Sequence, residues 1–166
     1  MLAIATSICA GGISTQVPMT LKGSKTFYVS GWMAGAEPAE FMVDTGSSYM
    51  TINQVTLDML KSDGQAVYLR DLSGVLANGD ELVVPIYRIP RIILGDSCEL
   101  LDVEAAVFPG ETRQILGLSV LRKTAPFTFS TDPPELQLSN CNQQVSLSDR
   151  QVPAPVDRYS HPRARE

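Results

Sequence analysis

The stretch FMVDTGSSYMTI, residues Phe41 to Ile52, is an apolar run that ends on an acid, turns at a glycine and then resumes. Short apolar runs of this kind are typical of β-strands that face a core. Asp44 therefore follows a buried strand directly, at a place where an ionised carboxylate is costly to remove from water. Two interpretations are open: a strand end closed by an Asx turn, or a site that uses the carboxylate.

Short β-prone segments separated by turn residues continue outward from this stretch, between Lys25 and about Asn140. Their spacing is typical of an all-β barrel or sandwich. Asn78-Gly79 lies between two β-prone arms and predicts a long hairpin from Val67 to Arg88, because a type I′ turn needs positive φ at both central residues. Further strands are predicted at 26–33, 41–46, 49–52, on both sides of the 95–97 turn with residues 92–94 facing the core, at 127–130 and at 135–139.

Helices are expected to be few and short. Asn53 is a good N-cap for a helix in which Val55, Met59 and Leu60 would share one face. The segment 114–123 is expected to enter as a strand, pass through Gly117 and continue as a helix of about two turns. The predicted fold class is therefore all-β, with one or two short helices.

Composition narrows the classes of function. With 166 residues, 44% of them hydrophobic, the chain suits a single folded domain. Its net charge of -5, with no basic cluster ahead of the last few residues, argues against a nucleic-acid partner. The cysteines, Cys9, Cys98 and Cys141, are too scattered for a disulfide framework or a zinc site, although a single disulfide stays open. No metal site is expected.

Three segments are predicted along the chain. Residues 1–19 form an apolar leader, which could be a signal, the remnant of an anchor or an N-terminal strand; it lacks a basic n-region. Residues 20–140 form the folded domain, and residues 141–166 a disordered polar tail. The leader leaves the compartment open but favours a periplasmic, secreted or membrane-anchored location over the cytoplasm. Membrane association is expected only if the leader belongs to an anchor, since no apolar run is long enough to span a bilayer.

Histidine-based chemistry is improbable for this chain. The single histidine, His161, lies in the polar tail, whereas a Ser-His-Asp or Cys-His arrangement needs a positioned imidazole. No glycine-rich phosphate loop is present in a strand-to-helix context. Carboxylate chemistry remains, because two carboxylates that share one proton place an acid beside a base and can activate water.

Several motifs follow one another along the chain: FMVDTGSS at 41–48, the Asn-Gly hairpin about 30 residues later, Ile115-Leu116-Gly117 before a short helix, and then FTFS with LQL. In this order the chain resembles the retropepsin-like aspartic proteases from roughly Thr20 to Asn140, nearest to their single-domain bacterial branch. The resemblance implies a small closed β-barrel and no metal or cofactor.

The resemblance also implies roles for individual residues. Asp44 would be the catalytic aspartate, Thr45 and Gly46 would complete the signature triplet, and Thr45 hydroxyls would bond across a dimer. Substrate would contact Ser47 and the tip of a mobile flap, which consists of Ala77, Asn78 and Gly79. A further element, Ile115, Leu116 and Gly117, would support the site from behind. Two departures from retroviral members, Leu118 after Gly117 and Ser47 in place of alanine, weaken any transfer of retroviral specificity.

The chain contains one Asp-Thr-Gly, so a second carboxylate must come from a second copy. We therefore expect a homodimeric aspartic endopeptidase that hydrolyses peptide bonds with a water activated by paired Asp44 side chains. Its partners would be a second copy and a peptide or protein substrate. Two alternatives remain: a weak or inactive dimer of the same fold that binds peptides, and an unrelated β-barrel that binds a small ligand.

Overall fold

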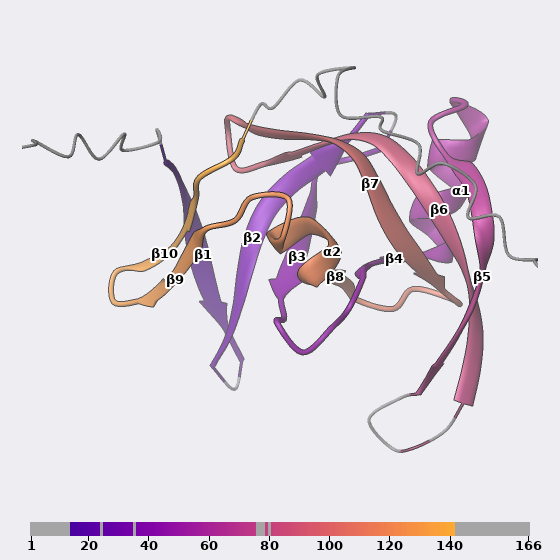
Figure 1. The fold of residues 1–166 in the computed structure, drawn as a ribbon, viewed down its shortest axis with the longest axis horizontal. Helices are drawn as coiled ribbons and strands as arrows, with labels where there is room; N and C mark the ends of the chain where they lie inside the picture. Colours follow the sequence, from indigo (N-terminus) through magenta and orange to yellow (C-terminus); the bar gives the residue numbers. More distant parts are fainter. Residues whose placement is uncertain (1–13, 24, 35, 76–78, 80, 142–166) are drawn as a thin grey trace, which may run out of the picture.

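The computed structural model describes residues 14–23, 25–34, 36–75, 79 and 81–141 (Figure 1). Strands dominate this part of the chain, and its two helices are short. In chain order the elements are β1 (Thr15–Lys22), β2 (Thr26–Met33), β3 (Ala39–Val43), β4 (Met50–Asn53), α1 (Gln54–Ser62), β5 (Val67–Val75), β6 (Glu81–Leu94), β7 (Cys98–Phe108), β8 (Gln114–Leu116), α2 (Leu118–Leu121), β9 (Phe127–Thr131) and β10 (Pro134–Leu138).

The central strands close into a ring. Neighbouring strands follow the order β6-β7-β4-β8-β3-β2, and β2 then pairs with β6 again through Gly31–Met33 and Ile92–Leu94. Phe41, Met33 and Ile92 are among the largest side chains that are fully buried inside it. The predicted all-β fold with a small closed barrel is therefore confirmed.

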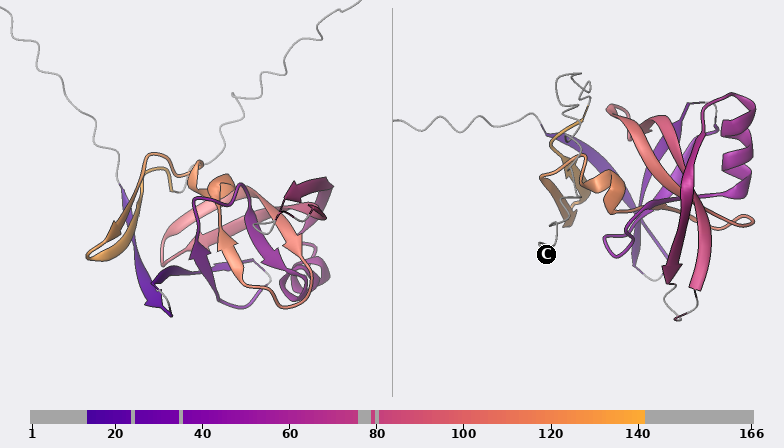
Figure 2. Two further views of the ribbon diagram at one scale, coloured as in Figure 1. Left: turned by 90° about the horizontal axis from the view of Figure 1, so that it is seen from below. Right: turned by 45° about the vertical axis from the view of Figure 1, so that its right-hand side comes forward.

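The strand β6 belongs both to this barrel and to the predicted hairpin. Within its 14 residues, β6 pairs with β5 through Glu81–Arg88 and with β2 through Ile92–Leu94, while β7 runs beside it from Ile86 to Leu94. Val67 pairs with Arg88, as the sequence predicted for the hairpin. The hairpin extends beyond the barrel (Figures 1 and 2). Ala77 and Asn78 lie outside the described residues, whereas Gly79 is described and has φ of 90°.

Strand β1 lies outside the ring with β9 and β10. It pairs with β2 through Met19–Lys22 and with β10 through Thr15–Pro18, so the terminal strands form an arm beside the barrel (Figure 2). The predicted domain boundary at residue 20 falls within β1, and residues 1–13 and 142–166 lie outside the described part. Within the described residues, no helix has the length and apolar character needed to cross a membrane.

Both helices differ in detail from expectation. Asn53 caps α1 as predicted, accepting a bond from the Thr56 backbone N–H at 2.9 Å. Leu60 is buried and Met59 half-buried, whereas Val55 is 47% exposed and Leu57 is buried in its place. The prediction was wrong at Val55, because residues two apart on a helix, such as Val55 and Leu57, point about 200° away from each other.

The second helix is shorter than the two turns predicted. Helix α2 contains four residues, and the Thr124 hydroxyl donates to the Leu121 carbonyl at 2.9 Å just beyond its end. This bond offers the carbonyl a partner outside the helix ladder, and Pro126 then cannot continue the helix. The expectation for residues 92–94 was also wrong at Ile93, which is half-buried, because successive residues of β6 alternate between faces.

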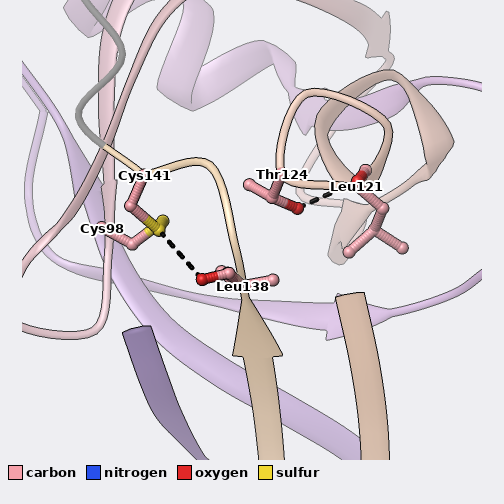
Figure 3. The surroundings of a disulfide bond; sticks show 5 residues. All are labelled: Cys98, Leu121, Thr124, Leu138 and Cys141. Atoms are coloured by element: carbon pink, nitrogen blue, oxygen red, sulfur yellow. Dashed lines mark hydrogen bonds between the residues drawn. A yellow bond between two sulfur atoms is a disulfide. The ribbon is translucent and has the colours of Figure 1, made fainter. Parts of the chain in front are cut away.

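A disulfide joins Cys98, at the start of β7, to Cys141, just after β10 (Figure 3). The sequence left a single disulfide open without indicating which cysteines would form it. Cys98 is fully buried, and the bond links residues 43 positions apart. The end of the arm is thereby attached covalently to the barrel.

Candidate active site

Asp44 lies at the start of the loop that joins β3 to β4. Its backbone N–H donates to the Leu116 carbonyl at 3.2 Å, which extends the parallel pairing of β3 with β8 by one residue. Phe41, three residues earlier, is fully buried and anchors the strand in the core. The apolar strand thus brings a half-buried carboxylate to the rim of the barrel.

The loop itself orients this carboxylate. The Gly46 backbone N–H donates to Asp44 Oδ1 at 2.8 Å, and the Ser47 N–H donates to the Asp44 carbonyl at 3.3 Å. A Cβ on residue 46 would lie only 3.1 Å from Asp44 Oδ1. The Asx turn that the sequence offered as one interpretation is therefore present. It orients the carboxylate and is compatible with a functional role for Asp44. Thr45 is exposed beside it.

Ile115, Leu116 and Gly117 lie directly behind the loop. Just after them, the Leu118 N–H donates to the Ser47 carbonyl at 2.8 Å and the Ser119 N–H to the Ser48 carbonyl at 3.0 Å. A Cβ on Gly117 would lie 2.1 Å from the Tyr49 carbonyl oxygen. Only glycine allows this close approach of two backbone segments.

Ser119 supports the loop in a way that the sequence did not reveal. Its hydroxyl accepts a bond from the Met50 N–H at 2.8 Å and donates to the Glu104 carbonyl at 3.0 Å. It therefore connects α2 with the start of β4 and with β7. The partners of Ser119 lie too far along the chain for a local sequence pattern to show them.

A groove of about 560 Å³ runs between the Asp44 loop and the hairpin. Asp44, Gly46 and Ser47 line one side, and Leu72–Gly74 of β5 with Val84 of β6 line the other. The remaining lining residues, none of which the sequence singled out except Ile115, are Ser48, Tyr49, Thr51, Ala106, Phe108 and Ile115. A carboxylate thus faces a largely apolar surface under the hairpin.

A charged cluster lies beside this groove. Arg70 of β5 bonds to Glu104 of β7 through Nη2 at 2.6 Å, and its Nη2 also donates to the Tyr49 hydroxyl at 3.2 Å. The bond to Glu104, followed by the bond to Tyr49, raises the pKa of Arg70 above its ordinary value. Elsewhere in the described chain, no group of three His, Cys, Asp or Glu side chains is arranged to hold a metal ion.

A closed barrel with an Asp-Thr-Gly loop facing a hairpin across a groove defines a protein of the acid protease class. The chain belongs to the aspartyl protease family, whose model matches residues 29–120. Its structure is similar to the crystal structure of a retropepsin-like aspartic protease from Rickettsia conorii, with a TM-score of 0.54 and 19% identity over 76% of this chain and 92% of that chain. At this identity the likeness concerns the fold. A search of curated proteins found no match.

Replacing Gly117 with alanine is expected to lower the free energy of unfolding by about 1–3 kcal/mol, the usual cost of overpacking. The new methyl group would meet backbone oxygens of Tyr49 and Ser47, which cannot move without displacing the Asp44 loop. Urea unfolding measures the change. Gly74→Ala is the matched control, because its Cβ would meet nothing closer than a carbonyl oxygen at 3.9 Å. Equal stability of the two variants would contradict the argument.

Proposed function

We propose that this protein is a homodimeric aspartic endopeptidase in which one Asp44 from each chain forms the catalytic pair. The observation that carries the proposal is the placement of Asp44, half-buried and oriented by Gly46, in a groove that hairpin residues also line. Membership of the aspartyl protease family supports it. The Asp-Thr-Gly triplet occurs once in the chain, so a second copy must supply the second carboxylate.

The proposed reaction uses water as the nucleophile. One Asp44 is ionised and takes a proton from a water molecule as the oxygen attacks the scissile carbonyl carbon. The protonated Asp44 of the second copy donates a hydrogen bond to the carbonyl oxygen, and a proton is then delivered to the leaving amine. No covalent intermediate forms on the protein. Thr45 would bond across the two-fold axis beneath the pair.

The groove supports an extended peptide as substrate. Leu72, Val84 and Phe108 pack against one apolar cluster and line the groove together with Ile115, so side chains on the substrate near the scissile bond would meet apolar surfaces. Binding them removes apolar area from water. Gly79, and with it Ala77 and Asn78, would belong to the flap that closes over the peptide. Ser47 would contact the peptide from the loop below.

Mixing subunits tests the shared site. A roughly ninefold excess of the Asp44→Asn chain, allowed to exchange with the wild type, should reduce cleavage to about a tenth, since random pairing leaves about that share of wild-type chains in wild-type dimers. Initial rates are measured with peptide in large excess over protein. Undiminished cleavage after verified exchange would show that each chain acts alone.

A further inference from the structure

Tyr49, Arg70 and Glu104 come from three separate segments and meet at one end of the groove. The Arg70 guanidinium bonds to both carboxylate oxygens of Glu104, at 2.6 and 3.4 Å, and to the Tyr49 hydroxyl at 3.2 Å. Tyr49 belongs to the Asp44 loop, Arg70 to the hairpin and Glu104 to the barrel. The cluster therefore connects the three parts that surround the groove.

The strand register explains why these side chains meet. Arg70 pairs with Ile86, and Ile86 pairs with Ala106 on the next strand. Glu104 lies two residues before Ala106 and so points to the same face of the sheet. Arg70 thus reaches across β6 to β7. Tyr49 immediately precedes Met50, which pairs with Ala105, and this pairing brings the loop to the level of Glu104.

Tyr49 is held at both ends. Its ring packs against a small apolar cluster of Val84, Ile86 and Ala106, and it lines the groove. Its carbonyl oxygen accepts a bond from the Ser47 hydroxyl at 2.8 Å. The bond from Arg70 to the phenol then fixes the direction of the ring, because a tyrosine has few other degrees of freedom.

Arg70 is also the place where the hairpin is attached to the loop. Among the described strands, β5 pairs with β6 alone, and its register shifts between Tyr68 and Arg70. Leu72–Gly74, the residues of β5 that line the groove, begin two positions after Arg70. The bond from Arg70 to Tyr49 therefore connects this wall of the groove to the Asp44 loop, in addition to the apolar cluster against which Leu72 and Tyr49 both pack.

We propose that Arg70 is a positioning residue that sets the width of the substrate groove by tying the hairpin to Tyr49, with Glu104 holding Arg70 in place. Tyr49 is the member of the cluster that contacts substrate. This inference rests on the proposed protease function and extends it. Arg70 does not take part in the chemistry and acts on substrate binding through Tyr49 and the hairpin.

The kinetic test is Arg70→Gln in the full chain. Loss of uniform binding raises KM and leaves kcat unchanged, so we expect KM for a peptide substrate to rise about 3–10-fold with kcat within about twofold. Tyr49→Phe, which keeps the ring and removes the bond from Arg70, should raise KM in the same direction. Combined in one chain, the two substitutions should cost less than the product of their separate effects, because both remove the same bond.

Arg91→Gln is the matched control. Arg91 is 43% exposed against 44% for Arg70, and its bond to Glu99 at 2.5 Å joins β6 to β7, whereas the bond of Arg70 to Glu104 joins β5 to β7. Arg91 lies over the Trp32 ring and does not line the groove. Its loss should affect stability at least as much as the loss of Arg70, while KM stays at the wild-type value. A rise in KM equal to that of Arg70→Gln would overturn the inference.

Hydrogen exchange separates this inference from the proposed function. Amides of β5 from Leu72 to Gly74 should exchange faster in Arg70→Gln than in Arg91→Gln or the wild type, because the hairpin has lost its attachment. If the wild-type chain cleaves no peptide, the proposed function fails, and exchange alone decides whether Arg70 holds the hairpin. If the wild type cleaves peptide but Arg70→Gln changes neither KM nor the exchange of these amides, or changes only one of them, the role of Arg70 is overturned and the protease proposal stands.

Discussion

Peptide cleavage by the Asp44→Asn variant is expected to fall at least about 10³-fold below the wild type, which is within the usual range for removing an acid-base group. Asparagine cannot accept the proton of the attacking water. It keeps an oxygen for the Gly46 N–H bond, so the loop and the stability should be preserved. Initial rates on a mixed peptide library, with and without a transition-state-mimicking inhibitor, measure the effect.

Asp102→Asn provides the control for this result. Asp102 is exposed in β7 and has φ of 51°, a conformation that asparagine tolerates well. The substitution removes the same charge at a residue that does not line the groove. Its cleavage should equal that of the wild type. Equal cleavage by the Asp44→Asn variant would refute the catalytic role of Asp44.

Removing the disulfide is expected to lower the free energy of unfolding by about 2–4 kcal/mol. The upper value, about 4 kcal/mol, is the chain-entropy estimate for a loop of this length. The bond closes a segment with a sequence separation of 43, which includes β8, α2, β9 and β10. Urea unfolding of the Cys98→Ala, Cys141→Ala variant, compared with the oxidised wild type, measures the loss.

Cys9→Ser is the matched control for the disulfide, because Cys9 lies outside the described residues and is not part of the bond. Its stability should equal that of the oxidised wild type. A double variant as stable as the wild type would show that the arm is held by strand pairing alone.

Local chemistry made several elements predictable. Asn53 reveals the start of α1 because its side chain caps the helix three residues away. Asn78-Gly79 between two β-prone arms predicts the hairpin, and β5 and β6 pair on its two sides from Val67–Arg88 to Val75–Glu81. The same local reasoning failed at Val55 and Ile93. There, which face of an element is buried depends on packing partners that the element itself does not contain.

The candidate site was predictable only in its centre. Asp44 could be chosen because a carboxylate after a buried strand needs an explanation, whereas Tyr49, Phe108 and Ser119 carry no comparable signal. Their positions depend on which strands become neighbours. Arg70 and Glu104 are 34 residues apart in sequence, and only the pairing of β5, β6 and β7 brings them together.

The sequence by itself determined the local elements of this protein: the apolar strand that ends at Asp44, the glycine turn after it, the hairpin and the capped helix. These follow from φ preferences, capping bonds and the alternation of side chains, all of which act over a few residues. Only the tertiary structure decided the closure of the barrel through β2 and β6, the partner of Cys98, and the cluster that joins Arg70 to Tyr49. The physical reason is that burial and long-range pairing depend on the whole core, so no short stretch of sequence contains both partners.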